Sequence, residues 1–477
     1  MYYTENFNSD SFKPTHFESK GNINIDGSEI TYTTVSEDTL FYDENGKPIA
    51  SIYSYSYFRK GVDTKDRPVI FAFNGGPGSA SMYVHAGFFG TRRLKYGQAD
   101  RESSLPPYEV IDNPDCLLDI ADIVLIDPVG CGYGVLLDSS KKDDFYGIEE
   151  DAESILMFVE KWCHKYNRWT SPKYLIGESY GCTRIAVMAG MSVSQGKEKC
   201  YGVKFDGLVM IGNTVTIGDF FNENVRVEPS VIYFPTFAAI NWYHNHPTSQ
   251  SLEEFVQEAK QFADTEYLLA LYKGESLQSK EREDILSKIT YYTNMDREYL
   301  EKNALKIEEE TFRQEVIKQK GKAVSRYDGR MTRPLYIPQI DEEKLAIEVD
   351  ATANRYDGYF FGALTGEIFP LLNVKLDRSY VPSSSLWDNW NIKCKGGTTA
   401  KRLRDAMNQT FGMRTFFANG WYDNCTEIGH VFYTLDHAGL PKDRITVKGY
   451  ESGHMIYIGE DNCKELSNDI RNFILNK

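Results

Sequence analysis

A serine between two glycines stands where a short apolar run meets a helical pattern. The sequence Gly177-Glu178-Ser179-Tyr180-Gly181 ends the run 173–177 and precedes the helix-like segment 182–191. Small flanking residues allow a sharp backbone turn that lifts a serine hydroxyl above the edge of a sheet. We therefore predict that Ser179 is a nucleophile, which needs a nearby base to take its proton.

The base and the acid that orients it are expected later in the chain. With such a turn the order is serine, acid, histidine, each partner in a loop after a late strand. The apolar segment 414–419 leads into Asp423, and the segment 445–450 leads into His454. We predict that His454 takes the proton from Ser179 and later returns it, while Asp423 fixes the tautomer of the imidazole and stabilises its cation.

A glycine-rich segment, Asn74-Gly75-Gly76-Pro77-Gly78, follows the apolar run 68–73. Glycines leave backbone N–H groups accessible, so the N–H groups of Gly76 and Tyr180 are candidates for an oxyanion hole. A tight turn that requires positive φ explains the same glycines equally well. Spacing alone does not separate the two interpretations.

Short apolar runs alternate with helical patterns in the first half of the chain. This alternation predicts an α/β fold with a mostly parallel central sheet flanked by helices. The pattern stops near residue 225, and helix-like stretches at 251–272, 281–303 and 308–320 follow in a region rich in Glu, Lys, Gln and Tyr. We interpret 1–224 and 376–477 as two parts of one core, and 225–375 as an inserted helical cap.

Composition and charge exclude several classes of function. The chain has 53 basic and 69 acidic residues, a net charge of −16, so we expect neither nucleic acid nor a membrane surface as a partner. No apolar stretch approaches the roughly 20 residues of a membrane helix. Eight scattered cysteines and an N-terminus unlike a signal peptide predict a cytoplasmic protein, unless a signal peptide has been removed.

The sequence predicts no cofactor and no metal site. His244 and His246 lie two positions apart, but no cluster of further ligands accompanies them. The oligomeric state stays open, a homodimer included.

Three segments together resemble the serine carboxypeptidase family: NGGPGSAS at 74–81, GESYG at 177–181 and GHM at 453–455. The segment ANGWYD at 418–423 stands where that family has its catalytic acid. VSRYDGR at 324–330, LRDAM at 403–407 and YESGHMIY at 450–457 are most similar to the bacterial branch. The resemblance implies an α/β-hydrolase fold with an inserted cap. It also implies a peptide substrate that loses C-terminal residues through an acyl-enzyme on Ser179.

The resemblance further implies a receptor for the terminal carboxylate of the substrate, made of Asn74 and Glu178. A glutamic acid donates a hydrogen bond to a carboxylate only while it keeps its proton, which favours acidic pH. Secreted relatives have another acid where this chain reads Gly-Phe-Phe-Gly at 87–90. We predict that Arg92 or Arg93 binds the carboxylate instead, because a guanidinium matches it with two hydrogen bonds.

Two other functions remain open. The same three residues serve esterases, other serine peptidases and acyltransferases. The acid missing near residue 88 leaves one of these activities open as the alternative to a carboxypeptidase. A catalytically silent binding protein is the third hypothesis, and it predicts that a fluorophosphonate does not label Ser179.

Overall fold

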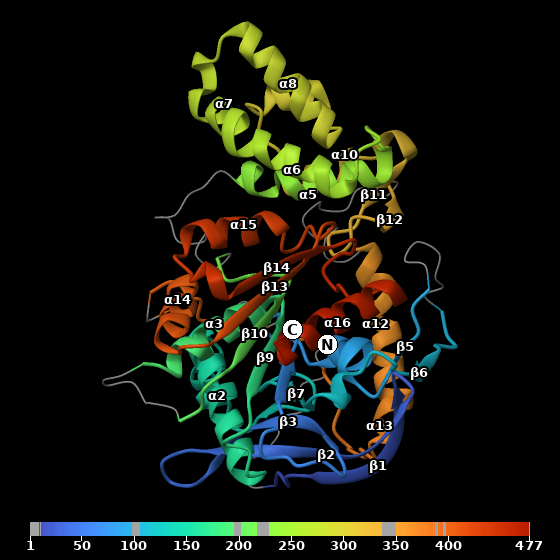
Figure 1. Cartoon of the computed structure of the whole chain (residues 1–477), viewed down its shortest axis with the longest axis vertical. Helices are drawn as coiled ribbons and strands as arrows, with labels where there is room; N and C mark the ends of the chain where they lie inside the picture. The colour runs from blue at the N-terminus through green and yellow to red at the C-terminus, as the bar shows by residue number, and fades with distance from the viewer. Residues whose placement is uncertain are drawn as a thin grey trace.

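A ten-stranded sheet forms the centre of the molecule, in the order β1-β2-β3-β7-β4-β9-β10-β13-β14 with β8 paired to β3 (Figure 1). The computed structural model describes residues 9, 11–97, 105–194, 202–216, 229–335, 350–384, 386, 390–394 and 397–476. The strands are β1 His16–Ile25, β2 Ser28–Tyr42, β3 Pro48–Arg59, β4 Val69–Phe73, β7 Asp122–Asp127, β8 Val135–Leu136, β9 Lys173–Glu178, β10 Gly207–Ile211, β13 Arg414–Gly420 and β14 Ile445–Tyr450.

The six strands from β7 to β14 are parallel, whereas β1, β2 and β3 form an antiparallel extension. The carboxyl ends of the parallel strands therefore meet along one edge of the sheet. β4 ends just before Asn74 and β9 just before Ser179, while β13 and β14 end shortly before Asp423 and His454. Ligands bind at this edge in open α/β sheets, so the fold brings all the predicted site segments together.

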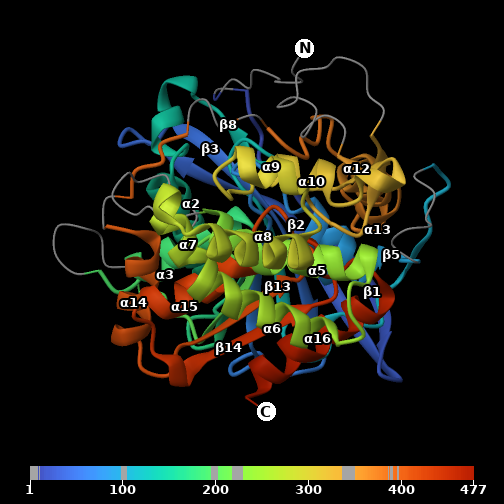
Figure 2. The same ribbon diagram turned by 90° about the horizontal axis from the view of Figure 1, so that it is seen from above.

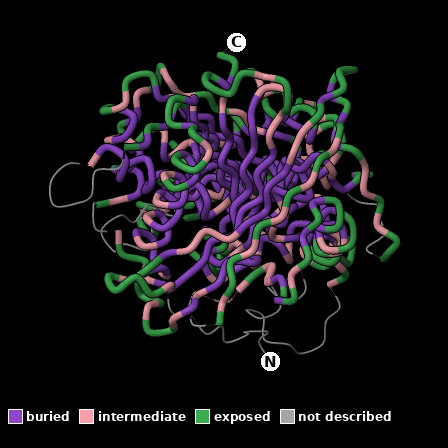
Figure 3. The backbone as a smooth tube through the Cα atoms, turned by 90° about the horizontal axis from the view of Figure 1, so that it is seen from below, coloured by how far each residue is buried: buried purple, intermediate pink, exposed green. Residues whose placement is uncertain are grey.

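Helices cover both faces of the parallel strands, and Figure 3 shows that the centre of the molecule is buried. Successive side chains of a strand point to opposite faces. Tyr174 and Ile176 accordingly join one hydrophobic cluster, and Leu175 joins the other. α2 Ile148–Lys165, α3 Tyr180–Met191 and α14 Thr399–Gln409 pack in the cluster of Leu175, and α16 Glu460–Leu475 packs in that of Tyr174. The predicted α/β class with a mostly parallel sheet is confirmed.

The inserted region forms a helical layer above the carboxyl edge, between β10 and β13 (Figures 1 and 2). It contains α5 Pro229–Asn245, α6 Leu252–Phe262, η4 Ala263–Tyr267, α7 Leu268–Lys273, η5 Gly274–Ser276, α8 Ser279–Thr293, α9 Arg297–Lys302, α10 Glu309–Glu315, η6 Lys318–Lys320, and the hairpin of β11 Lys322–Val324 and β12 Thr332–Pro334. Its apolar side chains form a third cluster, and α5 packs on α15 Ile428–His437 of the core.

The cap and the core divide differently from the predicted boundary at residue 375. α12 Ala351–Ala363, η7 Leu364–Ile368 and α13 Phe369–Leu371 contribute Tyr356 and Phe360 to the cluster of Tyr174 in the core, not to the cap cluster. If the cap is defined by the residues of its own hydrophobic cluster, it ends before α12.

The remaining short elements are α1 Met82–Val84, η1 His85–Phe89, β5 Arg92–Leu94, β6 Val110–Asp112, η2 Leu117–Asp119, η3 Ser139–Asp144 and η9 Lys442–Arg444. None of the helices in the described ranges combines the length and apolar character needed to cross a bilayer.

Candidate active site

Ser179 occupies a strained turn between β9 and α3. Its backbone has φ 60° and ψ −128°, a conformation that is costly for any residue with a side chain. A Cβ added to Gly177 would lie 2.5 Å from the carbonyl oxygen of Gly181, so the two ends of the turn approach too closely for larger residues. The predicted strand, turn and helix around Ser179 are present.

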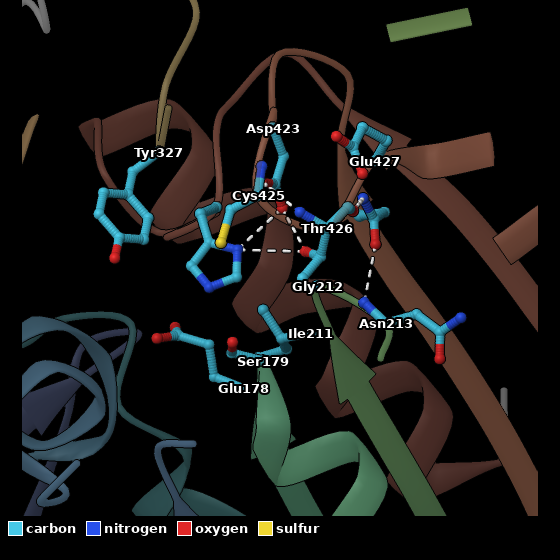
Figure 4. A network of polar contacts seen from close by, with 12 residues as sticks. Glu178, Ser179, Ile211, Gly212, Asn213, Tyr327, Asp423, Cys425, Thr426 and Glu427 are labelled. Atoms are coloured by element: carbon cyan, nitrogen blue, oxygen red, sulfur yellow. Dashed lines mark hydrogen bonds and ion pairs between the residues drawn. The ribbon is translucent and has the colours of Figure 1, made fainter. Parts of the chain in front are cut away.

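Asp423 and His454 form a buried pair in the loops that follow β13 and β14. Nδ1 of His454 lies 2.9 Å from Oδ2 of Asp423 (Figure 4). Oδ1 of Asp423 accepts hydrogen bonds from the N–H groups of Cys425 at 2.7 Å and Thr426 at 3.0 Å, and Oδ2 accepts one from the Thr426 hydroxyl at 2.6 Å. This arrangement fixes the imidazole with Nε2 directed away from the carboxylate.

The electrostatics of this pair favour an ionised acid. Burial alone would raise the pKa of Asp423, but the neighbouring His454 cation and the hydrogen bonds from Thr426 lower it below its usual value. Burial would lower the pKa of His454, and the charge of Asp423 more than offsets this and raises it. Asp423 can therefore stabilise an imidazolium that forms during a reaction.

One peptide segment links the serine turn to this pair. The Ser179 N–H donates to the carbonyl of Ile211 at 2.8 Å, and a Cβ on the next residue, Gly212, would lie 3.2 Å from Nδ1 of His454. Within the described ranges the Ser179 hydroxyl makes no hydrogen bond. Catalytic hydrogen bonds are often long without substrate and tighten when it binds. The structure thus gathers Ser179, Asp423 and His454 at one edge, and their catalytic roles stay predictions.

The glycine-rich loop lies directly against the serine turn. A Cβ on Gly75 would lie 2.4 Å from the backbone nitrogen of Tyr180, so the loop can approach only as glycine. Gly76 has φ +102°, which fits the turn interpretation of the segment. Tyr180 is the first residue of α3, where N–H groups lack partners within the helix. The close approach of the loop to Tyr180 is consistent with an oxyanion hole formed by the N–H groups of Gly76 and Tyr180, which stays a prediction.

Asn74 and Glu178 contact each other next to Ser179. Nδ2 of Asn74 donates to Oε1 of Glu178 at 2.7 Å, and Oδ1 of Asn74 accepts from the Val84 N–H at 3.1 Å. Burial raises the pKa of Glu178 to about 7, although the His454 cation and the Asn74 amide act in the opposite direction. Glu178 can therefore carry a proton in mildly acidic solution.

The two arginines predicted to bind a carboxylate have partners on and around β5. The five N–H groups of Arg93 all donate, to the targets Asn113, Leu94, Asp115 and Glu460. Arg92 donates to Asp112 at 2.7 Å and to the Val110 carbonyl at 3.1 Å. Arg93 thus has no N–H left for a substrate, whereas Nε of Arg92 is buried without an acceptor among the described residues, so a role for Arg92 stays a prediction.

A segment of the insertion, residues 325–330, reaches the site, and sequence reasoning gave it no role there. We call it the clamp segment. The Tyr327 carbonyl accepts from the His454 N–H at 2.6 Å, and the Arg326 carbonyl accepts from the Asn424 N–H at 3.1 Å. The clamp segment therefore holds both the loop of the acid and the loop of the histidine. Its only signal in the sequence was the similarity of VSRYDGR to a family pattern.

His244, one of the two histidines considered as metal ligands, contacts the clamp segment. Nε2 of His244 lies 2.7 Å from the carbonyl oxygen of Gly329 in the clamp segment. Among the residues that the structure describes, no group of three or more potential ligands is arranged to hold a metal.

Comparison with known proteins gives one family and several distant folds. The family model described as serine carboxypeptidase matches residues 41–351, a range that contains Asn74 and Ser179 and ends before Asp423. Carboxypeptidase Y homolog A of Penicillium rubens is 28% identical over 197 residues, which are 41% of this chain and 31% of that protein. The alignment thus spans about a third of that relative.

Two solved structures illustrate the distant folds. A peroxisomal alpha-beta-hydrolase of Saccharomyces cerevisiae is 10% identical, with a TM-score of 0.35 over 94% of this chain and 90% of that chain. An enantioselective mutant of epoxide hydrolase from Aspergillus niger is 10% identical, with a TM-score of 0.38 over 92% and 78%. Such low scores say nothing about activity. The family match, by contrast, covers well over half of the chain, and this chain therefore belongs to the serine carboxypeptidase family.

Proposed function

We propose that this protein is a carboxypeptidase that removes C-terminal residues from peptides through an acyl-enzyme on Ser179. The observation that carries the proposal is the Asn74–Glu178 pair, with its 2.7 Å hydrogen bond, directly beside the serine turn. An amide and a protonated carboxyl both donate hydrogen bonds, and together they suit the free carboxylate that ends a peptide.

The reaction would follow from the arrangement of the site. The hydroxyl oxygen of Ser179 attacks the carbonyl carbon of the last peptide bond while Nε2 of His454 takes its proton. The N–H groups of Gly76 and Tyr180 stabilise the oxyanion. His454 then gives the proton to the leaving amine. In the second half of the reaction His454 takes a proton from water, the water oxygen attacks the ester carbon, and the proton returns to the Ser179 oxygen as the shortened peptide leaves.

A mixed pool of peptides tests this proposal by mass spectrometry. We expect ladders shortened from the C-terminus, and no ladders with Ser179→Ala. A fluorophosphonate should label the native protein and leave Ser179→Ala unlabelled. Internal cleavage products, or intact peptides alongside a labelled serine, would contradict the carboxypeptidase assignment.

A second candidate is another α/β-hydrolase activity with the same three residues, such as an esterase, another serine peptidase or an acyltransferase. Arg93 favours this alternative, because all its N–H groups are engaged and it adds nothing to the Asn74–Glu178 pair as a carboxylate receptor. Blocked dipeptides assayed beside simple esters separate the two. Turnover of esters alone would favour the second candidate.

Two finer proposals concern origin and compartment. Membership of the bacterial branch is supported by the segments 324–330, 403–407 and 450–457. A reducing, cytoplasmic environment is supported by the seven described cysteines, all free thiols. Thiol titration of the unfolded protein, with and without reductant, tests the latter.

A further inference from the structure

Among the described residues, Arg326 is a cation near the Asp423–His454 pair whose guanidinium has neither a hydrogen-bond partner nor an ion-pair partner. Within the described part of the chain it makes no hydrogen bond or ion pair, and its Nε is buried without an acceptor. The guanidinium carbon lies over the ring of Tyr327, 6.0 Å from its centroid. In contrast, Arg184 and Arg330, which are also largely buried, each bind an aspartate through two nitrogens. Burying a charge without a partner is costly, so this arrangement is expected where a ligand supplies the partner.

The backbone that carries Arg326 is held firmly. Its N–H donates to Oδ2 of Asp350 at 2.7 Å, and its carbonyl accepts from the Asn424 N–H at 3.1 Å. Ser325, the preceding residue, donates to Asp350 at 2.8 Å and accepts from the Asn424 side chain through its carbonyl at 3.1 Å. A binding group on so rigid a support loses little conformational freedom when its ligand arrives.

The guanidinium lies within electrostatic reach of the reactive groups. Its charge is close enough to lower the pKa of His454, against the larger effect of Asp423. The next residue, Tyr327, has its ring 5.6 Å from the imidazole of His454. Figure 4 shows Tyr327 and Cys425 around the pair, with Glu178 and Ser179 below it. Arg326 thus belongs to the wall of the candidate active site.

The charges of Cys425, Glu309 and Glu427 raise the pKa of Arg326 against the effect of burial, so it stays a cation. Near neutral pH these groups offset only part of its charge. Burial raises the pKa of Glu309, on α10, to about 7 and that of Glu427, before α15, to about 8. Burial likewise raises the pKa of the Cys425 thiol to about 12, so the thiol is neutral. Arg313, also on α10, pairs with Glu309 and Glu310. Asp350 is engaged by Ser325 and by backbone N–H groups.

We propose that Arg326 binds a carboxylate of the peptide substrate. This inference rests on the proposed function. A guanidinium matches a carboxylate with two parallel charge-assisted hydrogen bonds. The carboxylate has two sources in a peptide: the free C-terminus, or an acidic side chain on the residue before the scissile bond.

Four blocked dipeptides distinguish these sources. They end in either a free acid or an amide, and they have either Glu or Gln before the scissile bond. We compare kcat/KM for the native protein, Arg326→Met and Arg326→Lys. Arg333→Met is the matched control, because Arg333 lies on the nearby strand β12 and, among the described residues, its side chain donates only to the Pro334 carbonyl.

The native protein should prefer at least one carboxylate over its neutral counterpart. In Arg326→Met that preference should fall about tenfold, the effect of one lost charge-assisted interaction, and Arg333→Met should keep it. Loss of the acid-to-amide preference identifies the C-terminus as the ligand, and loss of the Glu-to-Gln preference identifies the side chain. Arg326→Lys should keep part of the preference, and it serves as the test if Arg326→Met does not fold.

The inference is overturned if all four substrates slow equally in the Arg326 variants, or if both preferences persist. A native protein that cleaves none of the dipeptides refutes the proposed function instead, so the two failures are distinguishable.

Discussion

Glu178 connects the chemistry of the site to pH. Its pKa of about 7, raised by burial, means that it donates a hydrogen bond to a substrate carboxylate below that pH and repels the carboxylate above it. We predict that KM for free-acid peptides rises roughly tenfold per pH unit above about 7, as the protonated fraction falls. Glu178→Gln keeps a donor that does not titrate, so its KM should be flat over the same range.

The measurement is a pH profile of KM for a free-acid peptide and for its amide. The amide serves as the control, since it brings no carboxylate to Glu178. An equally steep rise in KM for Glu178→Gln would refute the role of this carboxyl.

Thr426 is a second residue whose effect can be isolated. Its hydroxyl donates to Oδ2 of Asp423 at 2.6 Å and lies 3.2 Å from Nδ1 of His454. Thr426→Val removes this hydrogen bond from the carboxylate, and we expect kcat to fall about tenfold, which corresponds to about 1.4 kcal/mol. The pKa of Asp423 should rise and that of His454 should fall, so the acidic limb of the kcat profile should move to lower pH.

Thr426→Ser keeps the hydroxyl and should restore both kcat and the pH profile. If Thr426→Val lowers kcat with no movement of the acidic limb, Thr426 supports the loop without tuning the pair.

The sequence predicted candidate catalytic residues where they lie in a recognisable local motif. Ser179 lies in a turn whose glycines have a steric cause, and Asp423 and His454 follow late strands. Thr426 and Arg326 were not predictable, because their roles depend on loops that meet only in the folded chain. Arg93 shows the reverse case: an arginine suited to a carboxylate binds Glu460, more than 360 residues away in the sequence.

At the scale of elements, a buried arginine joins α3, α2 and the loop after β4. Arg184 donates to Asp151 of α2 at 2.7 and 3.2 Å and to the Asn74 carbonyl at 2.8 Å. It thereby fixes Asn74, whose side chain holds Glu178. We predict that Arg184→Lys, which cannot reach both partners with a planar fork, raises KM for free-acid peptides about tenfold and changes KM for amides less.

Arg168→Lys is the matched control. Arg168 is equally buried and pairs with Asp122 at 2.5 Å, at the start of β7 and so at the opposite end of the sheet from the site. Both variants should lower the melting temperature, but only Arg184→Lys should change the acid-to-amide ratio of KM. An unchanged ratio would leave Arg184 with a purely structural role.

Helices and strands were predictable to the extent that periodicity defines them. The stretch predicted at 251–272 corresponds to α6, η4 and α7, and the stretch at 281–303 divides into α8 and α9 at Asn294, which has φ 55°. The end of the cap was not predictable. The apolar residues Tyr356 and Phe360 of α12 indicate a buried face, but periodicity does not reveal which hydrophobic cluster covers it.

At the scale of the whole molecule, buried acids lie where the cap meets the core. Glu427 precedes α15 in the core, and burial raises its pKa from 4.5 in an exposed chain to about 8. The folded state therefore binds more protons than the unfolded state between these values, and stability falls as pH rises through this window. We predict that Glu427→Gln gains stability relative to the native protein from about pH 4.5 to about pH 8, by at most about 1.4 kcal/mol per pH unit.

Melting temperatures measured across this window check the prediction. Glu253→Gln, at an exposed position of α6 in the same cap, is the control and should parallel the native protein. A constant difference between Glu427→Gln and the native protein at every pH would contradict the raised pKa.

The clamp segment has a consequence for attempts to re-engineer this enzyme. Designers often treat an insertion above a conserved scaffold as an exchangeable module, to be trimmed or grafted for new selectivity. Here Tyr327 and Arg326, which belong to the insertion, hold the loops of His454 and Asp423 through backbone hydrogen bonds. A chimera that replaces residues 225–335 wholesale would remove the support of its own reactive groups, so a graft should retain 325–330 and exchange only the helices before it.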